Sequence, residues 1–419
     1  MNSLFSKFSE LSTSFTSWLS KKYKIDIAYI LRGGLWQSAG QIVGIVVGLT
    51  TSIAFANLLP KETFGIYSYI LSIAGLLSIF TLTGMDAAIT QSVARGYEGS
   101  VVAALVARMR WGFIGSLASS TIAIYYFSQN QPILGYAILL LAIFIPIMDP
   151  LAIFYDVLKG RKQFDIDARY SIIVQVTVAA LIISTLFLTS NILIILSAYF
   201  LSYTLTHFII LRRMISKYPL NKQESPDMIP YGKSLTLVRA ITSVAAYLDK
   251  ILLFNYISPV EVAIYSLAIA PVRKIEGFLG TIPTLALPKF SAYSKEELKK
   301  LLLGKVLKFS IVILIIIAIY VLIAQYFYQI LFPKYMESIF YSKLFSLTLI
   351  GFPLSLIYTY FQSQTLTKII FPYKIIIHAI QIILLFIFIH FYGILGAILA
   401  RIAGQIIGIP IILLFFKKS

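Results

Sequence analysis

The sequence contains no cysteine and only three histidines, which lie far apart at His207, His378 and His390. The absence of cysteine excludes disulfides, thiol catalysis and cysteine metal sites within this sequence. The histidines lack the close spacing of a shared metal site, so we expect no metal. The sequence also lacks a phosphate-binding loop of the G-x-x-x-x-G-K-[ST] type. We therefore expect no nucleotide-driven motor and no cofactor.

Charged residues are scarce as well. Only 12% of the 419 residues are charged and 59% are hydrophobic, whereas a soluble domain typically carries about 25% charged residues. The composition is that of a polytopic membrane protein. A net charge of +18 would suggest nucleic acid in a soluble protein, but basic residues also mark the cytoplasmic loops of membrane proteins. We expect membrane lipids as neighbours and no nucleic-acid partner.

Twelve stretches of the sequence are apolar enough to cross a bilayer as helices, which takes about 20 residues each. The predicted spans are 35–58, 64–84, 104–127, 131–154, 168–189, 191–211, 234–257, 261–285, 303–327, 339–361, 372–391 and 393–416. The sequence thus predicts an all-α membrane protein with about 12 transmembrane helices.

The orientation follows from the distribution of lysine and arginine between alternate loops. One set of loops and helix ends holds 27 of these residues, and the opposite set holds only Lys61 and Lys334. Because positive residues stay on the cytoplasmic side, both termini are predicted in the cytoplasm. An even number of spans requires the same result. We expect a multi-pass protein of the cell membrane.

The N-terminus lacks the continuous apolar stretch of a signal peptide. Apolar residues instead recur at helical spacing at Leu4, Phe8, Leu11, Phe15 and Trp18. Residues 2–22 are therefore predicted to form an amphipathic helix on the inner membrane surface.

The two halves of the sequence resemble one another. PKETFGIYSYILSI (60–73) matches PVEVAIYSLAIAP (259–271) with one gap, which places Tyr67 and Tyr265 198 residues apart. A weaker match joins 160–175 to 367–381. Six spans per half give a parallel internal repeat, with two six-helix lobes and a cavity between them. The predicted divisions are an N-terminal segment (1–32), an N-lobe (33–213), a cytoplasmic linker (214–233) and a C-lobe (234–419).

The loops between spans are short. The longest polar loops, 212–233 and 287–300, are predicted on the inner side, and the longest outer loop has about ten residues. None could hold a catalytic site by itself, so we do not expect an enzyme.

Charges interrupt the apolar sequence of the eighth predicted span. Residues 264–278 read IYSLAIAPVRKIEGF, with Arg273 near the middle of the span. Charges at membrane depth are costly and usually functional. Glu276 lies one turn after Arg273 and could pair with it, whereas Lys274 points about 100° away. The group is either a structural ion pair or a cationic patch for an anionic substrate.

Further basic residues fall within the predicted spans of the C-terminal half. Arg239 and Lys250 share one face of the seventh span, because they are about three turns apart. Arg239 could also extend to the inner surface. Asp249 is interpreted as the partner of a nearby cation. Arg401 in the last span could point into a cavity.

Acidic and amide side chains also occur within the spans. Asp149, alone in the apolar stretch AIFIPIMDPLAIF, is a candidate for proton or sodium coupling, or it could cap the helix after Pro150. Asp86, which ends the second span, is a possible coupling residue or charge partner. In the first span, Gln37 and Gln41 share a face with small residues, which suits either a cavity wall or close helix packing.

Several of these segments together resemble the polysaccharide (O-antigen type) flippases of the multidrug/oligosaccharidyl-lipid/polysaccharide (MOP) superfamily. The resemblance lies in LLPKETFGIYSYILSIAGLL, TGMDAAITQSVAR, LDKILLFNYISPVEVAIYSLAIAPVRKIEGF, LPKFSAY and FYGILGAILAR. It implies two lobes around a central cavity, as in multidrug (MATE) transporters of that superfamily, and alternating access. It also implies a substrate-binding role for cavity cations, here Arg273, Lys274, Arg239, Lys250 and Arg401.

The implied substrate is an oligosaccharide on a polyprenyl-type pyrophosphate lipid, and we expect the transporter to be a monomer. Arginine and lysine are suited to binding its anionic pyrophosphate. A multidrug or cation antiporter of the same superfamily is the alternative, although the candidate cavity is net basic. A membrane polysaccharide polymerase is a third possibility, which the short outer loops disfavour. The energy source stays open among ion gradients, membrane potential and substrate gradient.

Overall fold

The computed structural model describes the backbone of residues 27–419 and most side chains from Trp36 onward, with Gln37 and Pro288 excepted. The amphipathic helix predicted for residues 2–22 lies outside the described residues.

The described chain is helical throughout its spans. Its elements are α2 (Ile27–Leu58), α3 (Lys61–Leu77), η1 (Ser78–Thr81), α4 (Met85–Ala94), α5 (Ser100–Ser128), α6 (Pro132–Leu151), α7 (Phe154–Gly160), α8 (Phe164–Leu188), α9 (Ile192–Lys217), α10 (Met228–Tyr256), α11 (Pro259–Leu279), α12 (Thr281–Ser291), α13 (Lys295–Leu331), η2 (Pro333–Tyr335), α14 (Ser338–Phe345), η3 (Ser346–Leu354), α15 (Ser355–Ser363) and α16 (Thr367–Lys418).

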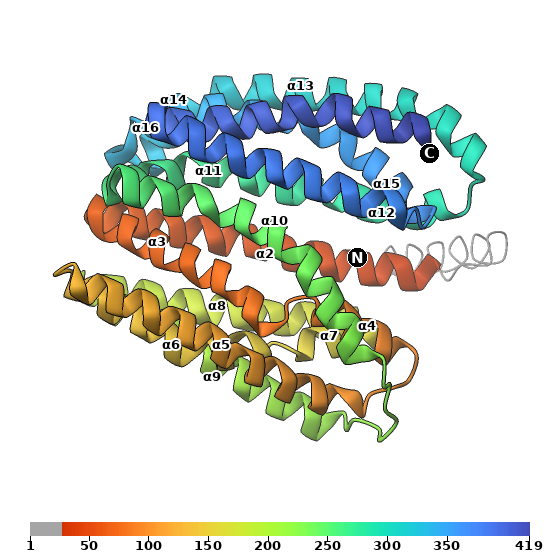
Figure 1. The fold of residues 1–419 in the computed structure, drawn as a ribbon, viewed down its shortest axis with the longest axis horizontal. Coiled ribbons are helices and arrows are strands. Elements are labelled where there is room, and N and C mark those ends of the chain that lie inside the picture. The colour runs from red at the N-terminus through yellow and green to blue at the C-terminus, as the bar shows by residue number, and fades with distance from the viewer. Residues whose placement is uncertain (1–26) are drawn as a thin grey trace, which may run out of the picture.

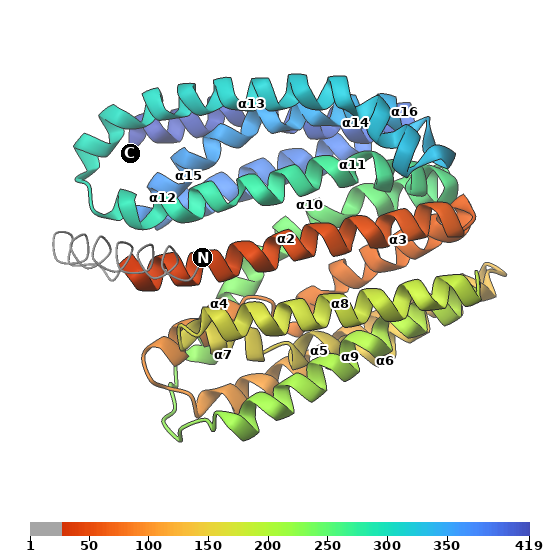
Figure 2. The same cartoon turned by 180° about the vertical axis from the view of Figure 1, so that it is seen from behind.

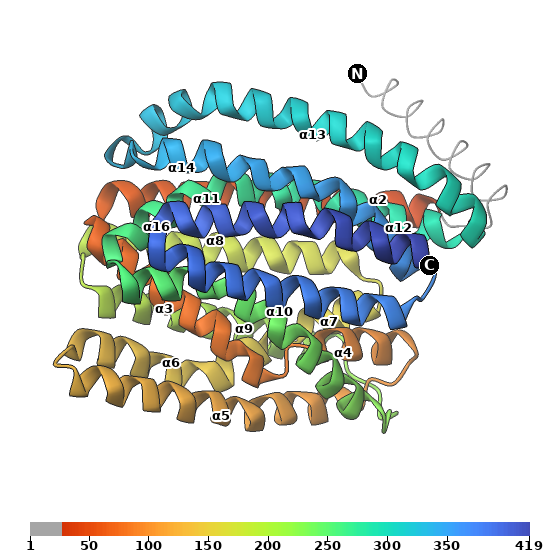
Figure 3. The same cartoon turned by 45° about the horizontal axis from the view of Figure 1, so that its top comes forward.

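Helix α16 is two membrane crossings rather than one. A straight helix of its 52 residues would be about 78 Å long, more than twice the hydrocarbon core. Gly393 breaks it with φ 55° and ψ −129°, a left-handed φ that glycine adopts without a Cβ clash. The chain therefore folds back, and Figure 3 shows the two arms of α16 side by side. The break lies where the sequence predicts a junction between two spans.

The twelve predicted spans all correspond to helical crossings in the described residues. Nine helical segments there are long and apolar enough to span a membrane on composition alone. Dividing α16 at Gly393 adds a tenth, and the remaining two are α10 and α11–α12, which carry several of the intramembrane charges. Charge within these two helices therefore explains why simple hydropathy does not find them.

The crossings form two six-helix lobes related as a parallel repeat. In Figures 1 and 2 the N-lobe helices α5, α6, α8 and α9 lie on one side, and the C-lobe helices α13 to α16 lie on the other. Helices α2, α3, α10 and α11 lie between these groups. The two copies of the repeated motif pack against each other, since a Cβ on Gly65 would lie 1.8 Å from the Pro259 carbonyl oxygen. Only glycine allows α3 and α11 to approach this closely.

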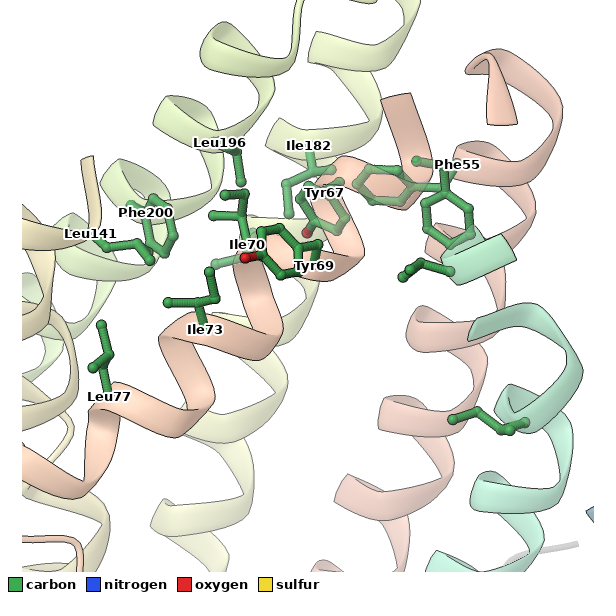
Figure 4. Packing of buried hydrophobic residues seen from close by; sticks show 14 of the residues in the cluster. Phe55, Tyr67, Tyr69, Ile70, Ile73, Leu77, Leu141, Ile182, Leu196 and Phe200 are labelled. Carbon is green, nitrogen blue, oxygen red and sulfur yellow. The ribbon is translucent and has the colours of Figure 1, made fainter. Parts of the chain in front are cut away.

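Helix α3 packs one apolar face against other helices of the N-lobe. Figure 4 shows Ile70, Ile73 and Leu77 pointing toward the helices that carry Leu141 and Phe200, and all five side chains are buried. Burial of each such side chain contributes about 1.5–3 kcal/mol in water, although within a bilayer close packing replaces much of that hydrophobic term.

The predicted inner loop at 287–300 is largely helical. Helix α12 runs to Ser291 and α13 begins at Lys295, so only residues 292–294 lie between them. The reason is a capping box, in which the Ser294 hydroxyl accepts from the Glu297 backbone N–H and the Glu297 carboxylate accepts from that of Ser294. The polar composition of this segment therefore marks the start of a helix rather than a loop.

Residues 218–227, here called the linker, join the lobes and are held by the N-lobe. Arg161 donates two hydrogen bonds to Glu98, of 2.6 and 2.7 Å, and a third of 3.1 Å to the Tyr218 carbonyl. The Asn221 backbone N–H donates to the same carboxylate at 3.0 Å. The hydrogen bonds from Arg161 hold the pKa of Glu98 below its usual range. The free segment is shorter than the predicted linker 214–233, because α9 and α10 extend into it.

Candidate functional site

A cavity of about 700 Å³ lies within the C-lobe, between α10, α11, η3, α15 and both arms of α16. We call it the C-lobe cavity. Its size falls in the usual range of ligand sites. Lys250, Arg273, Lys374 and Arg401 are among the residues that line it, and Asp249 is the acidic residue among them. The C-lobe cavity is therefore net basic.

Arg401 lines this cavity, but its charge is already paired. Its guanidinium donates to the Asp249 carboxylate at 3.1 and 2.5 Å and to the Ala245 carbonyl at 2.7 Å. The Tyr265 hydroxyl donates to the same carboxylate at 2.7 Å. Asp249 is thus the partner of Arg401 rather than of its neighbour Lys250. This pair joins the two helices on either side of the C-lobe cavity.

Lys250 and Arg273 present more available charge to the C-lobe cavity. The Lys250 side chain makes no hydrogen bond or ion pair to the described residues. Arg273 pairs with Glu276 at 2.8 Å and lies 5.4 Å from the Phe345 ring centroid. The Arg273 side chain is 44% exposed, so Glu276 occupies only part of its donor fork. The remaining N–H groups are free to bind an anion.

A second cavity lies in the N-lobe, between α2, α8 and α9. It consists of two hollows of about 450 and 490 Å³, which share Gly44, Gln175 and Tyr203 as lining residues. We call the hollow of about 450 Å³ the upper hollow and that of about 490 Å³ the lower hollow of the N-lobe cavity. Gln41 lines the lower hollow, whereas the side chain of Gln37 lies outside the described residues.

Lys274 crosses from the C-lobe helix α11 to this N-lobe cavity. A Cβ on Gly48 of α2 would lie 2.5 Å from the Lys274 ammonium nitrogen, so the lysine occupies space that only glycine leaves. Lys274 lines the upper hollow and has no hydrogen-bond or ion-pair partner within the described part of the chain. The small residues of α2 therefore form a cavity wall and also accommodate a side chain from the other lobe.

Arg239 lines neither of these cavities. It donates to the Thr83 carbonyl at 2.5 Å and to Asp86 at 3.3 Å. Arg108 donates to the other oxygen of Asp86 at 3.0 Å and lies 3.8 Å from Asp156. Asp86 thus connects N-lobe helix α5 to C-lobe helix α10 near the end of the bundle where basic residues are abundant. We call this the basic end.

The lobes also meet at the other end of the bundle. Lys61 of α3 forms an ion pair with Glu337, which lies between η2 and α14. The Lys334 ammonium donates to the Asn57 carbonyl at 2.6 Å, and the Asn57 amide donates to the Leu331 carbonyl at 2.9 Å. These contacts close the lobes against each other beyond the cavities.

Asp149 lies in neither cavity wall. It makes no hydrogen bond or ion pair to the described residues, although the charges of Arg108 and Asp86 act on it. Its side chain does not cap α7. No group of three or more histidine, aspartate or glutamate side chains in the described part of the chain is arranged to hold a metal ion.

The sequence did not single out the individual tyrosines of the N-lobe cavity, although tyrosines of the spans are suited to a polar wall. Tyr67, Tyr199 and Tyr203 line the upper hollow, and His207 lines the lower one. Tyr199, Tyr203 and His207 are spaced four residues apart and so share one face of α9. That spacing was a usable signal. Gln175, the last residue of the weaker repeat match, was another.

Comparisons with known proteins agree with this architecture. The family model "Polysaccharide biosynthesis protein" matches residues 30–294, more than half of the chain. No curated protein is similar enough in sequence to count as a relative. The fold is similar to the lipid II flippase MurJ in an inward closed conformation, with TM-score 0.71, 16% identity, and 92% of this chain and 87% of that chain covered.

Two other transporters of the MOP superfamily have the same fold. An inward-facing multidrug resistance MATE transporter gives TM-score 0.61 at 15% identity, covering 90% of this chain and 96% of that chain. A transporter from Pyrococcus furiosus, whose binding pocket of reverse polarity suggests a different function, gives 0.58 at 16% identity and covers 92% and 95%. The chain therefore belongs to the polysaccharide biosynthesis protein family and has the two-lobed membrane fold of the MOP superfamily.

Proposed function

We propose that the protein is a flippase that moves an oligosaccharide linked to a polyprenyl pyrophosphate across the cell membrane. One observation carries the proposal. Lys250 and Lys274 reach cavities at membrane depth without an ion pair to any described residue, and Arg273 is only partly neutralised. Uncompensated charge at this depth is costly and is retained where it binds a charged ligand. The ligand must be an anion.

A lipid pyrophosphate fits these cations. Arg273 can offer a planar fork to phosphate oxygens, and Lys250 and Lys274 provide point charges. We assign anion binding to these three residues. Arg239 and Arg401, which the sequence grouped with them, hold helices together through Asp86 and Asp249 instead.

Transport would proceed by alternating access, in which one lobe moves against the other around a central site. The contacts at the two ends of the bundle support this. The Asp86–Arg239 contact closes the basic end, and the Lys61–Glu337 pair closes the other end. We place the basic end and both termini in the cytoplasm on the positive-inside rule. Asp149 remains our candidate for proton or sodium coupling, and we expect the transporter to act as a monomer.

A multidrug or cation antiporter is the second candidate, because MATE transporters have the same fold. Such a transporter needs acids to attract a cationic drug. In the C-lobe cavity Asp249 is already bound to Arg401 and Tyr265, so the available charge is positive. A polysaccharide polymerase is a weaker candidate, since Asp249, the acid that lines the C-lobe cavity, is bound to Arg401 and Tyr265.

Two separate binding titrations distinguish these functions. The purified full chain in nanodiscs is titrated with a short-chain polyprenyl diphosphate, and separately with a lipophilic cation, tetraphenylphosphonium. We expect saturable binding of the diphosphate that weakens about tenfold or more in Lys250→Met, because a charge-assisted hydrogen bond contributes about 1.5–3 kcal/mol. Lys308→Met, which removes an exposed lysine of α13, is the control. Tighter binding of the cation than of the diphosphate would favour an antiporter.

A further inference from the structure

The N-lobe cavity differs in chemistry from the C-lobe cavity. The upper hollow is lined by Thr51, Ser52, Gln175 and three tyrosines, and Lys274 is the one residue of its described lining that carries charge at neutral pH. The lining thus combines aromatic rings with uncharged hydrogen-bonding groups.

The tyrosine hydroxyls in the upper hollow are available to a ligand. Those of Tyr67, Tyr199 and Tyr203 make no hydrogen bond to other described residues. The rings are held in place by aromatic packing. The Tyr67 ring stacks on that of Phe55 with 4.3 Å between the ring centroids, and it lies edge-on to the Tyr199 ring at a centroid distance of 6.0 Å. The ring centroids of Tyr199 and Tyr203 are 4.9 Å apart. A hydroxyl that faces the hollow without a protein partner can donate to or accept from a ligand, so the hollow suits a ligand that offers many hydrogen bonds.

A lipid chain does not fit this requirement, since it would leave the tyrosine hydroxyls and the Gln175 amide oxygen unpaired. The Gln175 amide N–H already donates to the Ser171 hydroxyl at 2.7 Å. An uncharged sugar ring does fit. Its hydroxyls can pair with the tyrosine, threonine and glutamine groups, and its C–H face can pack on an aromatic ring. A volume of about 450 Å³ lies within the usual range for small ligands.

The position of Lys274 connects this hollow to the anion site. Arg273 and Lys274 are consecutive on α11, and their side chains point about 100° apart into the C-lobe and N-lobe cavities. A ligand whose anionic group lies beside α11 would therefore place the adjoining group next to Lys274. In a lipid-linked oligosaccharide that adjoining group is the first sugar.

We infer that the upper hollow of the N-lobe cavity is a saccharide subsite, which binds the uncharged sugar ring attached to the pyrophosphate. Tyr203 and Gln175 act as specificity residues in it, and Lys274 contacts the phosphate at its entrance. The inference rests on the proposed function and adds to it which lobe recognises the sugar.

The test compares two probes on the full chain in nanodiscs: a short-chain polyprenyl diphosphate, and the same lipid carrying one N-acetylglucosamine on its diphosphate. We expect the wild type to bind the sugar-bearing probe about tenfold more tightly. Tyr203→Ala and Gln175→Ala should remove most of this difference, so that the two affinities converge. Tyr326→Ala, at a 65% exposed tyrosine of α13, is the matched control.

Glycine variants test the same subsite without removing a side chain that contacts the sugar. Gly44→Ala would place its Cβ 2.5 Å from the Gln175 amide oxygen, whereas at Gly40 the nearest atom is 3.7 Å away. We therefore expect Gly44→Ala to reduce the preference for the sugar-bearing probe and Gly40→Ala to retain it.

The outcomes separate this inference from the proposed function. If neither probe binds the wild type, the proposed function fails. If both probes bind with equal affinity, or if Tyr203→Ala and Gln175→Ala both fold and weaken both probes equally, the saccharide subsite is wrong while the anion site stands. If the alanine variants do not fold, the same comparison of the two probes is made with Tyr203→Phe, which removes only the hydroxyl.

Discussion

Arg273 and Lys274 are neighbours on α11, yet they line cavities in different lobes. Arg273 is paired with Glu276 on its own helix, whereas Lys274 reaches across the lobe interface to Gly48 of α2. The environments of the two cations therefore depend on different features. That of Arg273 depends on a local ion pair, and that of Lys274 depends on how closely the two lobes approach each other.

Removing the charge of Glu276 should strengthen anion binding at Arg273. The carboxylate is 2.8 Å from the guanidinium and competes with a bound phosphate for the same donors. We expect Glu276→Gln to bind inorganic pyrophosphate several-fold more tightly, as measured by calorimetry on the purified protein. Unchanged or weaker binding would mean that Glu276 positions Arg273 rather than competing for it.

The buried pair of Asp249 and Arg401 should matter for stability. The Asp249 side chain is only 2% exposed and that of Arg401 12%. Removing one partner of a buried pair typically costs about 3–5 kcal/mol, because the other charge is left uncompensated. We expect Asp249→Asn to lower the thermal unfolding temperature in detergent markedly. The double variant with Arg401→Met should recover part of the loss, and purely additive losses would contradict the pairing.

Cross-linking the lobes at the end opposite the basic end should stop transport. The described Lys61–Glu337 pair joins α3 to the segment before α14, and the sequence has no cysteine, so introduced thiols react without background. In a variant with Lys61→Cys and Glu337→Cys, a reducible bis-thiosulfonate linker should abolish translocation, and a reductant should restore it. Each single cysteine variant is the control. Full transport in the cross-linked protein would show that this end need not open.

The attachment of the linker to the N-lobe should depend on pH, because it involves the Glu98 carboxylate. Arg161 keeps the pKa of this carboxyl below its ordinary value, which is about 4.3. A lowered folded-state pKa gives stabilisation that is complete above the ordinary value and is lost as pH falls through the folded value. The protection factors for hydrogen exchange at residues 218–225, which correct for the intrinsic exchange rate at each pH, should therefore be high at neutral pH and lower below about pH 4. Glu98→Gln should exchange fast at neutral pH, and equal rates in both proteins would exclude this role.

The fold could be predicted from the sequence because membrane helices are specified by local composition. Each crossing satisfies its own backbone hydrogen bonds, so twelve apolar stretches and the break near Gly393 can be found without tertiary information. Loop 287–300 was predicted wrongly because a polar helix end and a polar loop have similar compositions. The capping pair Ser294 and Glu297 was the local signal that distinguished them.

The candidate site could be predicted only in part. The basic residues of the spans stand out by their charge, but charge alone does not reveal which cations are paired. The partner of Arg239 is 153 residues away at Asp86, and that of Arg401 is 152 residues away at Asp249. Such contacts depend on how the helices pack. The tyrosines of α9 were missed because aromatic residues are common in membrane helices and carry no charge.

Translocation by reconstituted protein is the most direct test of the central claim that these cations carry an anionic lipid across the membrane. The measurement is the transfer of a fluorescent polyprenyl-diphosphate sugar between leaflets of proteoliposomes that contain the double variant Arg273→Met, Lys274→Met. We predict that transfer falls about tenfold or more relative to wild type, while Lys308→Met is unaffected. Transfer by the double variant at the wild-type rate would contradict the account.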